Sequence, residues 1–157
     1  MPSRSTRAEP VRVGLVSDTH DLLRPEVLAF LRGSDHILHA GDICGEAVLL
    51  ALAQLAPLTV VQGNNDRGAW ARHLRATETV RLGGVAIHVV HDVKELELAP
   101  EVRVVVSGHS HKPAAQERDG ILFVNPGSAG PRRFKLPISA AELRIHEGRV
   151  SAHFTTF

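Results

Sequence analysis

Residues 11–20 read VRVGLVSDTH, an apolar, valine-rich run that stops abruptly at a polar segment. β-Branched residues favour strands, so we predict a buried strand over residues 11–17 with Asp18 just beyond its end. Pro25 then begins a segment with apolar residues at helical spacing, and Gly33 ends it. The start of the fold is therefore predicted to be a strand, a polar loop and a short helix.

The same alternation continues through the first half of the chain. Residues 37–40 (ILHA) and 58–62 (LTVVQ) are two further strand-like runs. The almost continuously apolar residues 46–55 lie between them and predict a helix that Pro57 ends. Strand, helix, strand, helix, strand with short connections is the pattern of parallel βαβ units.

The second half of the chain has a different pattern. Gly83-Gly84 separates two β-rich runs and predicts a hairpin over residues 79–90, and residues 102–107 form another buried strand. Asp119-Gly120 and Glu147-Gly148 predict two later hairpins. We therefore predict an α/β fold, a four-layer α/β/β/α sandwich of two mixed β-sheets flanked by helices.

The composition is that of one ordinary globular domain. The chain has 157 residues, of which 43% are hydrophobic and 22% charged, and a formal net charge of +1. This balance gives no strong nucleic-acid footprint, and no apolar run has the length of a membrane span. Cys44 is the only cysteine, which excludes an intrachain disulfide and a zinc site built on cysteines. Residues 1–10 are polar and lack the apolar region of a secretory signal, so we predict a disordered tail there. We predict a single domain over residues 11–157 and a cytoplasmic location.

Polar side chains of one chemical kind follow the strand-like runs. They form five motifs: Asp18-Thr19-His20, Gly41-Asp42, Gly63-Asn64-Asn65-Asp66, His91 and Gly108-His109-Ser110-His111. In open α/β sheets the carboxyl ends of the strands line the ligand crevice, so we expect these loops to converge at one edge. Carboxylate, imidazole and amide groups are suitable ligands for Mn, Fe, Zn, Ni or Co.

Each motif alone also has an ordinary structural explanation. Asp after Gly, as in Gly41-Asp42, is usually a turn or a helix cap, and residues 63–66 have the composition of a turn. His91 alone is also explained as a surface histidine at the end of a strand. The pair His109 and His111 is the strongest signal, because two imidazoles at this spacing after a buried strand have few structural uses. If there were no metal site, five separate structural explanations would have to apply by chance to motifs whose order along the chain suits one site. We therefore favour a metal site.

The number of ligands indicates two metal ions rather than one. The predicted ligands are Asp18, His20, Asp42, Asn64, His91, His109 and His111. They are too many for one tetrahedral ion but suit two ions that share a carboxylate. Two ions roughly 3.5–4 Å apart can acidify a bridging water and hold phosphate oxygens. With two aspartates in the site the remaining charge is positive, which matches a phosphodiester monoanion, so the residues indicate metal-assisted hydrolysis of a phosphate ester.

With these motifs, the chain resembles the calcineurin-like metallophosphoesterases, and in particular the YfcE-like phosphodiesterases, from about Val11 to its end. The segment Asn125-Pro126-Gly127-Ser128 adds to the resemblance. The resemblance implies one metal held by Asp18, His20, Asp42 and His111, and another held by Asp42, Asn64, His91 and His109, with Asp42 bridging. It also implies that Asp66 orients the site. The expected catalytic residues are Asp42, Asn64, Asp66 and His91.

Two departures from the family pattern bear on the chemistry. Many relatives carry His directly after the metal-binding Asn, whereas this chain has Asn65. An amide cannot act as a general acid, so leaving groups that need protonation are expected to react slowly. The usual His-Gly-His segment is replaced by His91-Asp92-Val93, and residues 92–108 are short for the usual connecting helix, which predicts a more open site.

The expected function is a phosphodiesterase that uses a metal-bridging hydroxide on a small phosphodiester, with two divalent ions, Mn before Fe, Zn, Ni or Co. Two alternatives stay open: a non-catalytic protein-interaction scaffold of the same fold, such as a retromer subunit, and a phosphomonoesterase, which Asn65 disfavours. No membrane partner is expected, and the late hairpins offer an edge for a homo-oligomer. His39 is either a support of the site or a strand histidine. Arg132 and Arg133 are either a solvated basic turn, which we favour, or contacts to a phosphate oxygen.

Overall fold

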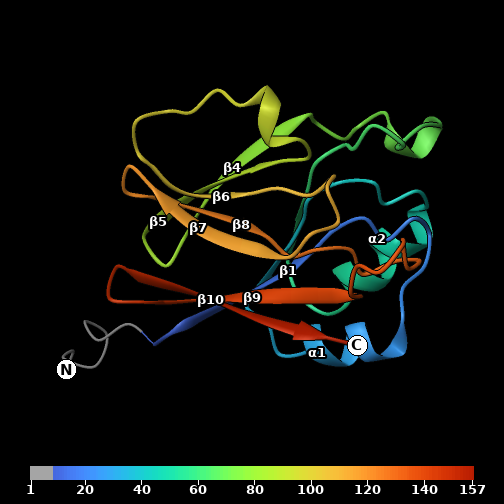
Figure 1. Ribbon diagram of the computed structural model, residues 1–157, viewed down its shortest axis with the longest axis horizontal. Coiled ribbons are helices and arrows are strands. Elements are labelled where there is room, and N and C mark those ends of the chain that lie inside the picture. Colours follow the sequence, from blue (N-terminus) through green and yellow to red (C-terminus); the bar gives the residue numbers. More distant parts are fainter. Residues whose placement is uncertain (1–8) are drawn as a thin grey trace.

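The computed structural model describes residues 9–157, apart from the side chain of Glu95, and contains two five-stranded mixed sheets (Figure 1). The strand order is β10-β9-β1-β2-β3 in the first sheet and β4-β5-β6-β8-β7 in the second. The predicted fold class, two mixed sheets in an α/β sandwich, is confirmed. Most of the tail predicted over residues 1–10 lies outside the described residues.

The first sheet is built around the predicted βαβ units. Its strands are β1 (Val11–Val16), β2 (His36–His39), β3 (Leu58–Val60), β9 (Ser139–His146) and β10 (Arg149–Thr156). β1, β2 and β3 run parallel, while β9 pairs antiparallel with both β1 and β10. The crossovers contain α1 (Pro25–Leu31) and α2 (Glu46–Ala53). Within the described residues, no helix has the length and apolar character to cross a membrane.

The second sheet contains two of the predicted hairpins. Its strands are β4 (Thr77–Leu82), β5 (Val85–Val90), β6 (Val102–Val106), β7 (Ala114–Arg118) and β8 (Ile121–Asn125). β4 pairs antiparallel with β5, and β7 with β8, whereas β6 lies parallel to both β5 and β8. The short 3₁₀ helices η2 (Ala69–Ala71) and η3 (Val93–Glu95) lie in the connections before β4 and β6.

The main core lies between the two sheets. Alternate residues of each strand face it, as the period of two in a β-strand requires: Val13 and Leu15 of β1 pack in the same cluster as Ile87 and Val89 of β5. All four side chains are fully buried. Because the strands of both sheets are fixed by this shared core, the loops at their ends are held in a defined relation to one another.

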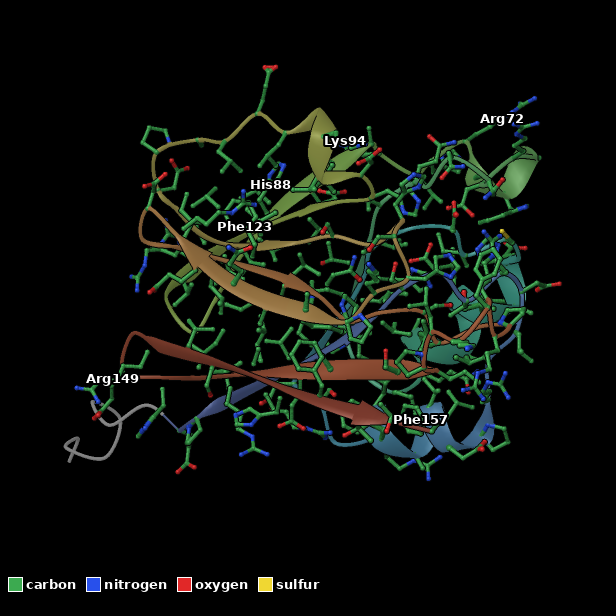
Figure 2. All side chains as sticks on the ribbon, viewed as in Figure 1. Arg72, His88, Lys94, Phe123, Arg149 and Phe157 are labelled. Atoms are coloured by element: carbon green, nitrogen blue, oxygen red, sulfur yellow. The ribbon has the colours of Figure 1, made fainter. Side chains whose placement is uncertain are left out.

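The outer faces of the two sheets are covered differently. α1 and α2 cover the first sheet, where their apolar residues pack against Val16 and Ile37. The second sheet is covered by the chain between β5 and β6, through Leu96 and Leu98, so the outer layer there is η3 and an extended segment. Phe123 of β8 lies on the same outer face, beneath Arg118, whose guanidinium is 4.4 Å from the ring centre (Figure 2).

Candidate metal centre

The loops that follow β1 and β2 are joined by their backbones. The Asp18 N–H donates to the Gly41 carbonyl at 3.0 Å, and the His20 N–H donates to the Asp42 carbonyl at 3.0 Å. The first two motifs therefore form one unit. Their carboxylates are placed together by the parallel pairing of β1 with β2 rather than by side-chain contacts.

The loops that follow β5 and β6 are joined in the same way and reach across to the first sheet. The Gly108 N–H donates to the His91 carbonyl at 2.9 Å. The His109 N–H donates to the Asp18 carboxylate at 3.1 Å, which links the two sheets at this edge. The predicted convergence of the motifs is therefore what the structure contains.

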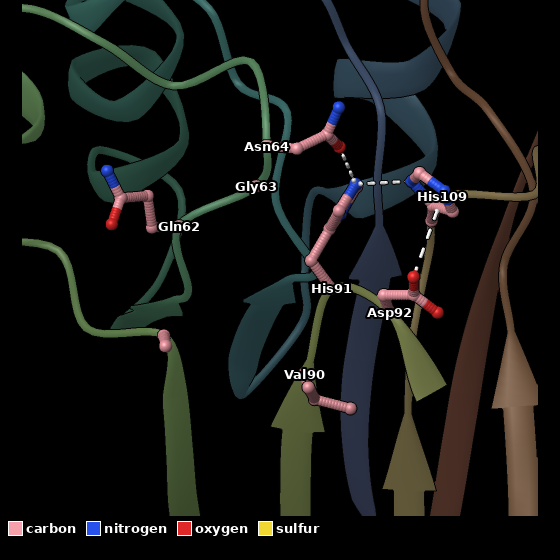
Figure 3. A pocket seen from close by; sticks show the side chains of 8 residues that line it. Gln62, Gly63, Asn64, Val90, His91, Asp92 and His109 are labelled. Atoms are coloured by element: carbon pink, nitrogen blue, oxygen red, sulfur yellow. Dashed lines mark hydrogen bonds and ion pairs between the residues drawn. The ribbon is translucent and has the colours of Figure 1, made fainter. Parts of the chain in front are cut away.

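His91 lies at the centre of the site (Figure 3). Its Nδ1 donates to the Ala40 carbonyl at 2.7 Å, which turns Nε2 toward the aspartates. Nε2 is 3.5 Å from Asp42 Oδ2 and 4.0 Å from Asp18 Oδ1. It also lies 2.9 Å from Asn64 Oδ1 and 3.3 Å from His109 Nδ1. This ring nitrogen is therefore surrounded by groups that could share a cation with it.

Asn64, His91 and His109 also line a hollow of about 170 Å³ that opens beside them. Its wall is formed by Gln62, Gly63, Asn64, Ala76, Val90, His91, Asp92 and His109. Asn64 and His109 are exposed, whereas His91 is buried, so the hollow connects solvent to the buried ring of His91. A small substrate can reach the site from this side.

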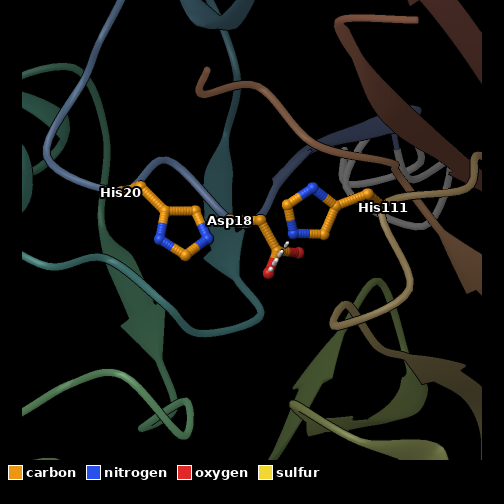
Figure 4. Close-up of side chains that lie close together, drawn as sticks. All are labelled: Asp18, His20 and His111. Carbon is orange, nitrogen blue, oxygen red and sulfur yellow. Dashed lines mark ion pairs between the residues drawn. The ribbon is translucent and has the colours of Figure 1, made fainter. Parts of the chain in front are cut away.

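Asp18, His20 and His111 form a second group next to the first (Figure 4). His111 Nε2 is 3.4 Å from Asp18 Oδ1, and the two imidazole ring centres are 5.6 Å apart. Asp18 is fully buried, yet neither its Oδ1 nor His20 Nε2 has a hydrogen-bond partner among the described residues. Buried polar atoms without partners are rare in proteins, so these fit the place of a cation. The donor set, with oxygen and imidazole nitrogen and no thiolate, suits a divalent transition metal.

The electrostatics of the site favour a positive charge beside the carboxylates. Burial alone would raise the pKa of Asp42, but hydrogen bonds from His91 and Asn65 outweigh burial and hold this pKa well below its usual range. Burial alone would lower the pKa of His91, but the hydrogen bonds to Asp42 and to the Ala40 carbonyl raise it to about 9. The two shifts are linked, because the Asp42 carboxylate and the His91 imidazolium each stabilise the charged form of the other.

Asp66 holds the backbone of two loops rather than facing the other ligands. It is buried, and its carboxylate accepts N–H groups from Asp42 at 2.9 Å, from Gly63 at 2.8 Å and from Cys44 at 2.8 Å. Gly63 is required at its position, because a Cβ there would lie 2.2 Å from the Asp42 backbone nitrogen. Asp66 therefore fixes the position of Asp42.

Asn65 binds Asp42 twice. Its backbone N–H donates to Asp42 Oδ1 and its side-chain amide donates to Asp42 Oδ2, both at 2.9 Å. Asn65 orients Asp42, but it has no proton to give to a leaving group.

His39 joins two loops of the site through its hydrogen bonds, an arrangement that fits both a support of the site and a strand histidine with satisfied hydrogen bonds. It is fully buried, and burial lowers its pKa to about 4, so the ring is neutral. The Gly41 N–H donates to Nδ1 at 3.1 Å, which leaves the proton on Nε2 to donate to Thr19 Oγ1 at 3.1 Å. Thr19 in turn donates to the Ile43 carbonyl. This chain of hydrogen bonds joins the loops after β1 and β2.

Two neighbours of the site were missed by sequence reasoning. Cys44 Sγ lies 3.5 Å from His20 Nδ1, and Asp92 Oδ2 lies 3.9 Å from His109 Nε2. Asp92 could have been found, since it directly follows His91. The spacing of Cys44 carries no such signal, because its side chain is placed by a left-handed backbone conformation with φ 64°.

Left-handed backbone conformations are concentrated in the site. Positive φ angles occur at Asp18 (54°), His20 (46°), Asp42 (58°), His109 (71°) and His111 (65°). Residues other than glycine adopt this region at a cost, and such strain persists where function requires it. The structure thus brings all seven predicted ligand residues together. Five of them have positive φ angles, which in turns are usually found at glycine.

Asp66→Asn is expected to weaken metal binding by about 10–100-fold, because the second layer of hydrogen bonds around a metal site has effects of this size. One carboxylate oxygen becomes an NH₂ group that faces backbone N–H donors, so at least one buried donor loses its acceptor, at about 1–3 kcal/mol. Titration of metal-stripped protein with Mn²⁺ measures the change. The control is Asp35→Asn, since Asp35 also accepts a backbone N–H, from Arg12, at a distance from the site. Equal affinity in both variants would contradict the role given to Asp66.

Comparison with known proteins agrees with this geometry. The chain matches the calcineurin-like phosphoesterase superfamily domain over residues 11–148. It is 34% identical over 154 residues to a probable metallophosphoesterase of Methanothermobacter thermautotrophicus, and the match covers 89% of each chain.

Solved structures share the fold over nearly the whole chain. A structure of an archaeal phosphodiesterase has a TM-score of 0.79 at 21% identity, covering 94% of this chain and 100% of that one. Vacuolar Protein Sorting 29 from Cryptosporidium parvum has a TM-score of 0.77 at 18% identity, covering 96% and 99%. At these identities the likeness concerns the fold, and the family rests on the sequence matches. The chain belongs to the calcineurin-like phosphoesterase superfamily.

Proposed function

We propose that the protein is a metal-dependent phosphodiesterase with two divalent ions in its site. One ion would be held by Asp18, His20, Asp42 and His111, and the other by Asp42, Asn64, His91 and His109. The observation that carries the proposal is the position of Asp42 Oδ2, which is 3.6 Å from His20 Nε2 and 3.5 Å from His91 Nε2. A carboxylate oxygen between two imidazoles that belong to different groups is suited to bridging two ions.

Bound divalent ions at such a site supply Lewis acidity and a water of lowered pKa. The chain's own part is to hold the ligands in place. His91 is fixed by the Ala40 carbonyl with Nε2 toward the aspartates, and Asp42 is fixed by Asp66 and Asn65. Little reorganisation is then needed during the reaction, which is the usual source of electrostatic catalysis.

The preference for diesters over monoesters rests on charge and on Asn65. Two divalent ions with two aspartates leave a positive site that suits a monoanion. Asn65, beside Asp42, offers no proton to the departing oxygen. We therefore propose activated diesters, whose leaving groups are stable as anions, as the best substrates.

The test is hydrolysis of an aryl phosphodiester by metal-stripped protein, with and without Mn²⁺, Fe²⁺, Zn²⁺, Ni²⁺ or Co²⁺. We expect turnover only with added metal, highest with Mn²⁺, and a faster reaction for bis(4-nitrophenyl) phosphate than for 4-nitrophenyl phosphate, which has the same leaving group. A faster monoester reaction would favour a phosphomonoesterase. Absence of turnover with every metal, in protein shown to be folded, would contradict the proposal.

A protein-interaction scaffold of the same fold is the second candidate. The likeness to Vacuolar Protein Sorting 29 favours it. The site argues against it, since a scaffold has no use for buried carboxylate and imidazole atoms without partners. Failure of metal-dependent turnover together with retained metal binding would favour the scaffold.

A further inference from the structure

The segment 131–137 (PRRFKLP), between β8 and β9, carries an aromatic side chain that the fold does not use. Phe134 is 93% exposed, far more than the other exposed large apolar residues. Its φ angle is 52°, in the left-handed region that bulky residues rarely adopt. The left-handed backbone costs stability, and the exposed ring makes no packing contacts with the described residues that would offset this cost. A residue that combines both is a candidate for a functional contact.

This segment begins at the wall of the metal site. Ser128 Oγ donates to the Asp18 carbonyl at 3.0 Å, and a Cβ on Gly130 would lie 2.3 Å from the Thr19 carbonyl oxygen. The chain before the segment is therefore packed directly on the loop that carries Asp18 and His20.

The segment also shares a hollow with the residue that follows His111. Phe134 lies with Lys135 and Leu136 around an apolar hollow whose remaining wall is Lys112. Lys112 directly follows His111, whose ring nitrogen is 3.4 Å from Asp18. A group bound on Phe134 would therefore lie against the residue that directly follows a predicted metal ligand.

The charged residues of this segment and of the hollow are all of one sign. Arg132, Arg133 and Lys135 flank it in the sequence, Lys112 lies across the hollow, and residues 125–141 contain no Asp or Glu. These four cations are exposed, so they are free to turn toward a bound anion. An exposed ring amid cations fits a ligand with a flat aromatic face and negative charge, because bases stack on aromatic side chains while Arg and Lys pair with phosphate.

We propose that Phe134, with Lys112, Arg132, Arg133 and Lys135, binds the nucleoside part of a nucleotide phosphodiester. The base stacks on Phe134, and a second phosphate of the same nucleotide pairs with the cations. This inference rests on the proposed function, which supplies the scissile phosphate at the metals. It names the substrate class, a small nucleotide diester, and it assigns Arg132 and Arg133 to phosphate contact rather than to a solvated turn.

The first test compares two diesters with one leaving group, thymidine 5′-(4-nitrophenyl phosphate) and methyl 4-nitrophenyl phosphate. In Mn²⁺-loaded protein, Phe134→Ala is expected to lower kcat/KM for the thymidine ester by about tenfold and to leave the methyl ester unchanged, in line with the strength of base stacking. Phe154→Ala, at a partly exposed phenylalanine of β10, is the control and should change neither. An equal loss on both esters, or no loss, would overturn the stacking role.

The second test measures binding without turnover. Thymidine 3′,5′-bisphosphate is titrated into the Mn²⁺-loaded protein by calorimetry, and we expect Phe134→Ala and Arg132→Gln/Arg133→Gln each to weaken binding by about fivefold or more. Arg149→Gln, at the turn of the β9–β10 hairpin, is the charge control (Figure 2). Bisphosphate binding that depends on Phe134 in a protein without turnover would refute the proposed function but support this inference. Binding unaffected by these variants would overturn the inference alone.

A third measurement separates function from folding. Phe134→Gly relieves the left-handed backbone and removes only exposed surface, so the midpoint of thermal unfolding should rise by about 2–4 °C while discrimination between the two esters is lost. A fall in this midpoint would show that Phe134 is kept for stability, against the proposal.

Discussion

Asp42→Ala is expected to lower Mn²⁺-dependent hydrolysis of an aryl phosphodiester by about 10³-fold or more, because it removes a charged group from the centre of the proposed site. Asp42 Oδ2 lies within 3.6 Å of ring nitrogens from both metal-binding groups. Without this carboxylate the two proposed ions would share no ligand, and their mutual repulsion would be balanced by Asp18 alone. The loss should therefore appear in kcat as well as in metal affinity.

Folding of the Asp42→Ala variant should be largely retained. Asp42 belongs to none of the hydrophobic clusters of the described residues, so its removal leaves the core intact and costs only its pairing with His91 and its hydrogen bonds from Asn65. Circular dichroism and thermal unfolding check this, and Glu117→Ala, at an exposed position of β7, controls for the loss of one negative charge. The Mn²⁺ content per chain should fall from two toward one. Activity within tenfold of the wild-type value, in folded variant protein, would remove Asp42 from the reaction.

The fold and the convergence of the motifs could be predicted because both depend on periodicity. Val13 and Leu15 alternate with outward residues, and each parallel strand places its last residues at the same edge. Asp18 and Asp42 follow neighbouring parallel strands, so their proximity follows from topology. The roles of these residues as ligands stay predictions that the variants above test.

Other features depend on local geometry that a pattern of residues does not contain. The approach of Cys44 to His20 and the strain at Phe134 arise from left-handed φ angles at residues that are not glycine. The tautomer of His39 also depends on one hydrogen bond, from the Gly41 N–H to Nδ1, which the sequence does not show. The net charge likewise gave no sign of the cations near Phe134, because a value of +1 is a sum over the whole chain and does not show where the charges lie.

Asn65→His is expected to raise the rate for diesters with poorly activated leaving groups by about 10²-fold, the lower range of general acid catalysis. The position is suitable, since the side chain of residue 65 already reaches Asp42 Oδ2 at 2.9 Å. The backbone N–H of residue 65 would still donate to Asp42 Oδ1, so Asp42 keeps one of its two anchors. For 4-nitrophenyl esters, whose leaving group needs no proton, the rate should gain nothing and should fall about as far as in Asn65→Ala.

The measurement is kcat/KM for aryl phosphodiesters over a range of leaving-group pKa values. In the Asn65→His variant the dependence on leaving-group pKa should be shallower, and the pH–rate profile should gain a descending limb as the imidazolium loses its proton. Asn65→Ala is the matched control, because it removes the same hydrogen bond to Asp42 without adding an acid, and should slow all esters alike. An unchanged slope in Asn65→His protein with full metal content would mean that residue 65 does not face the leaving group. Asn65 would then act only by holding Asp42, and the preference for activated diesters would need another cause.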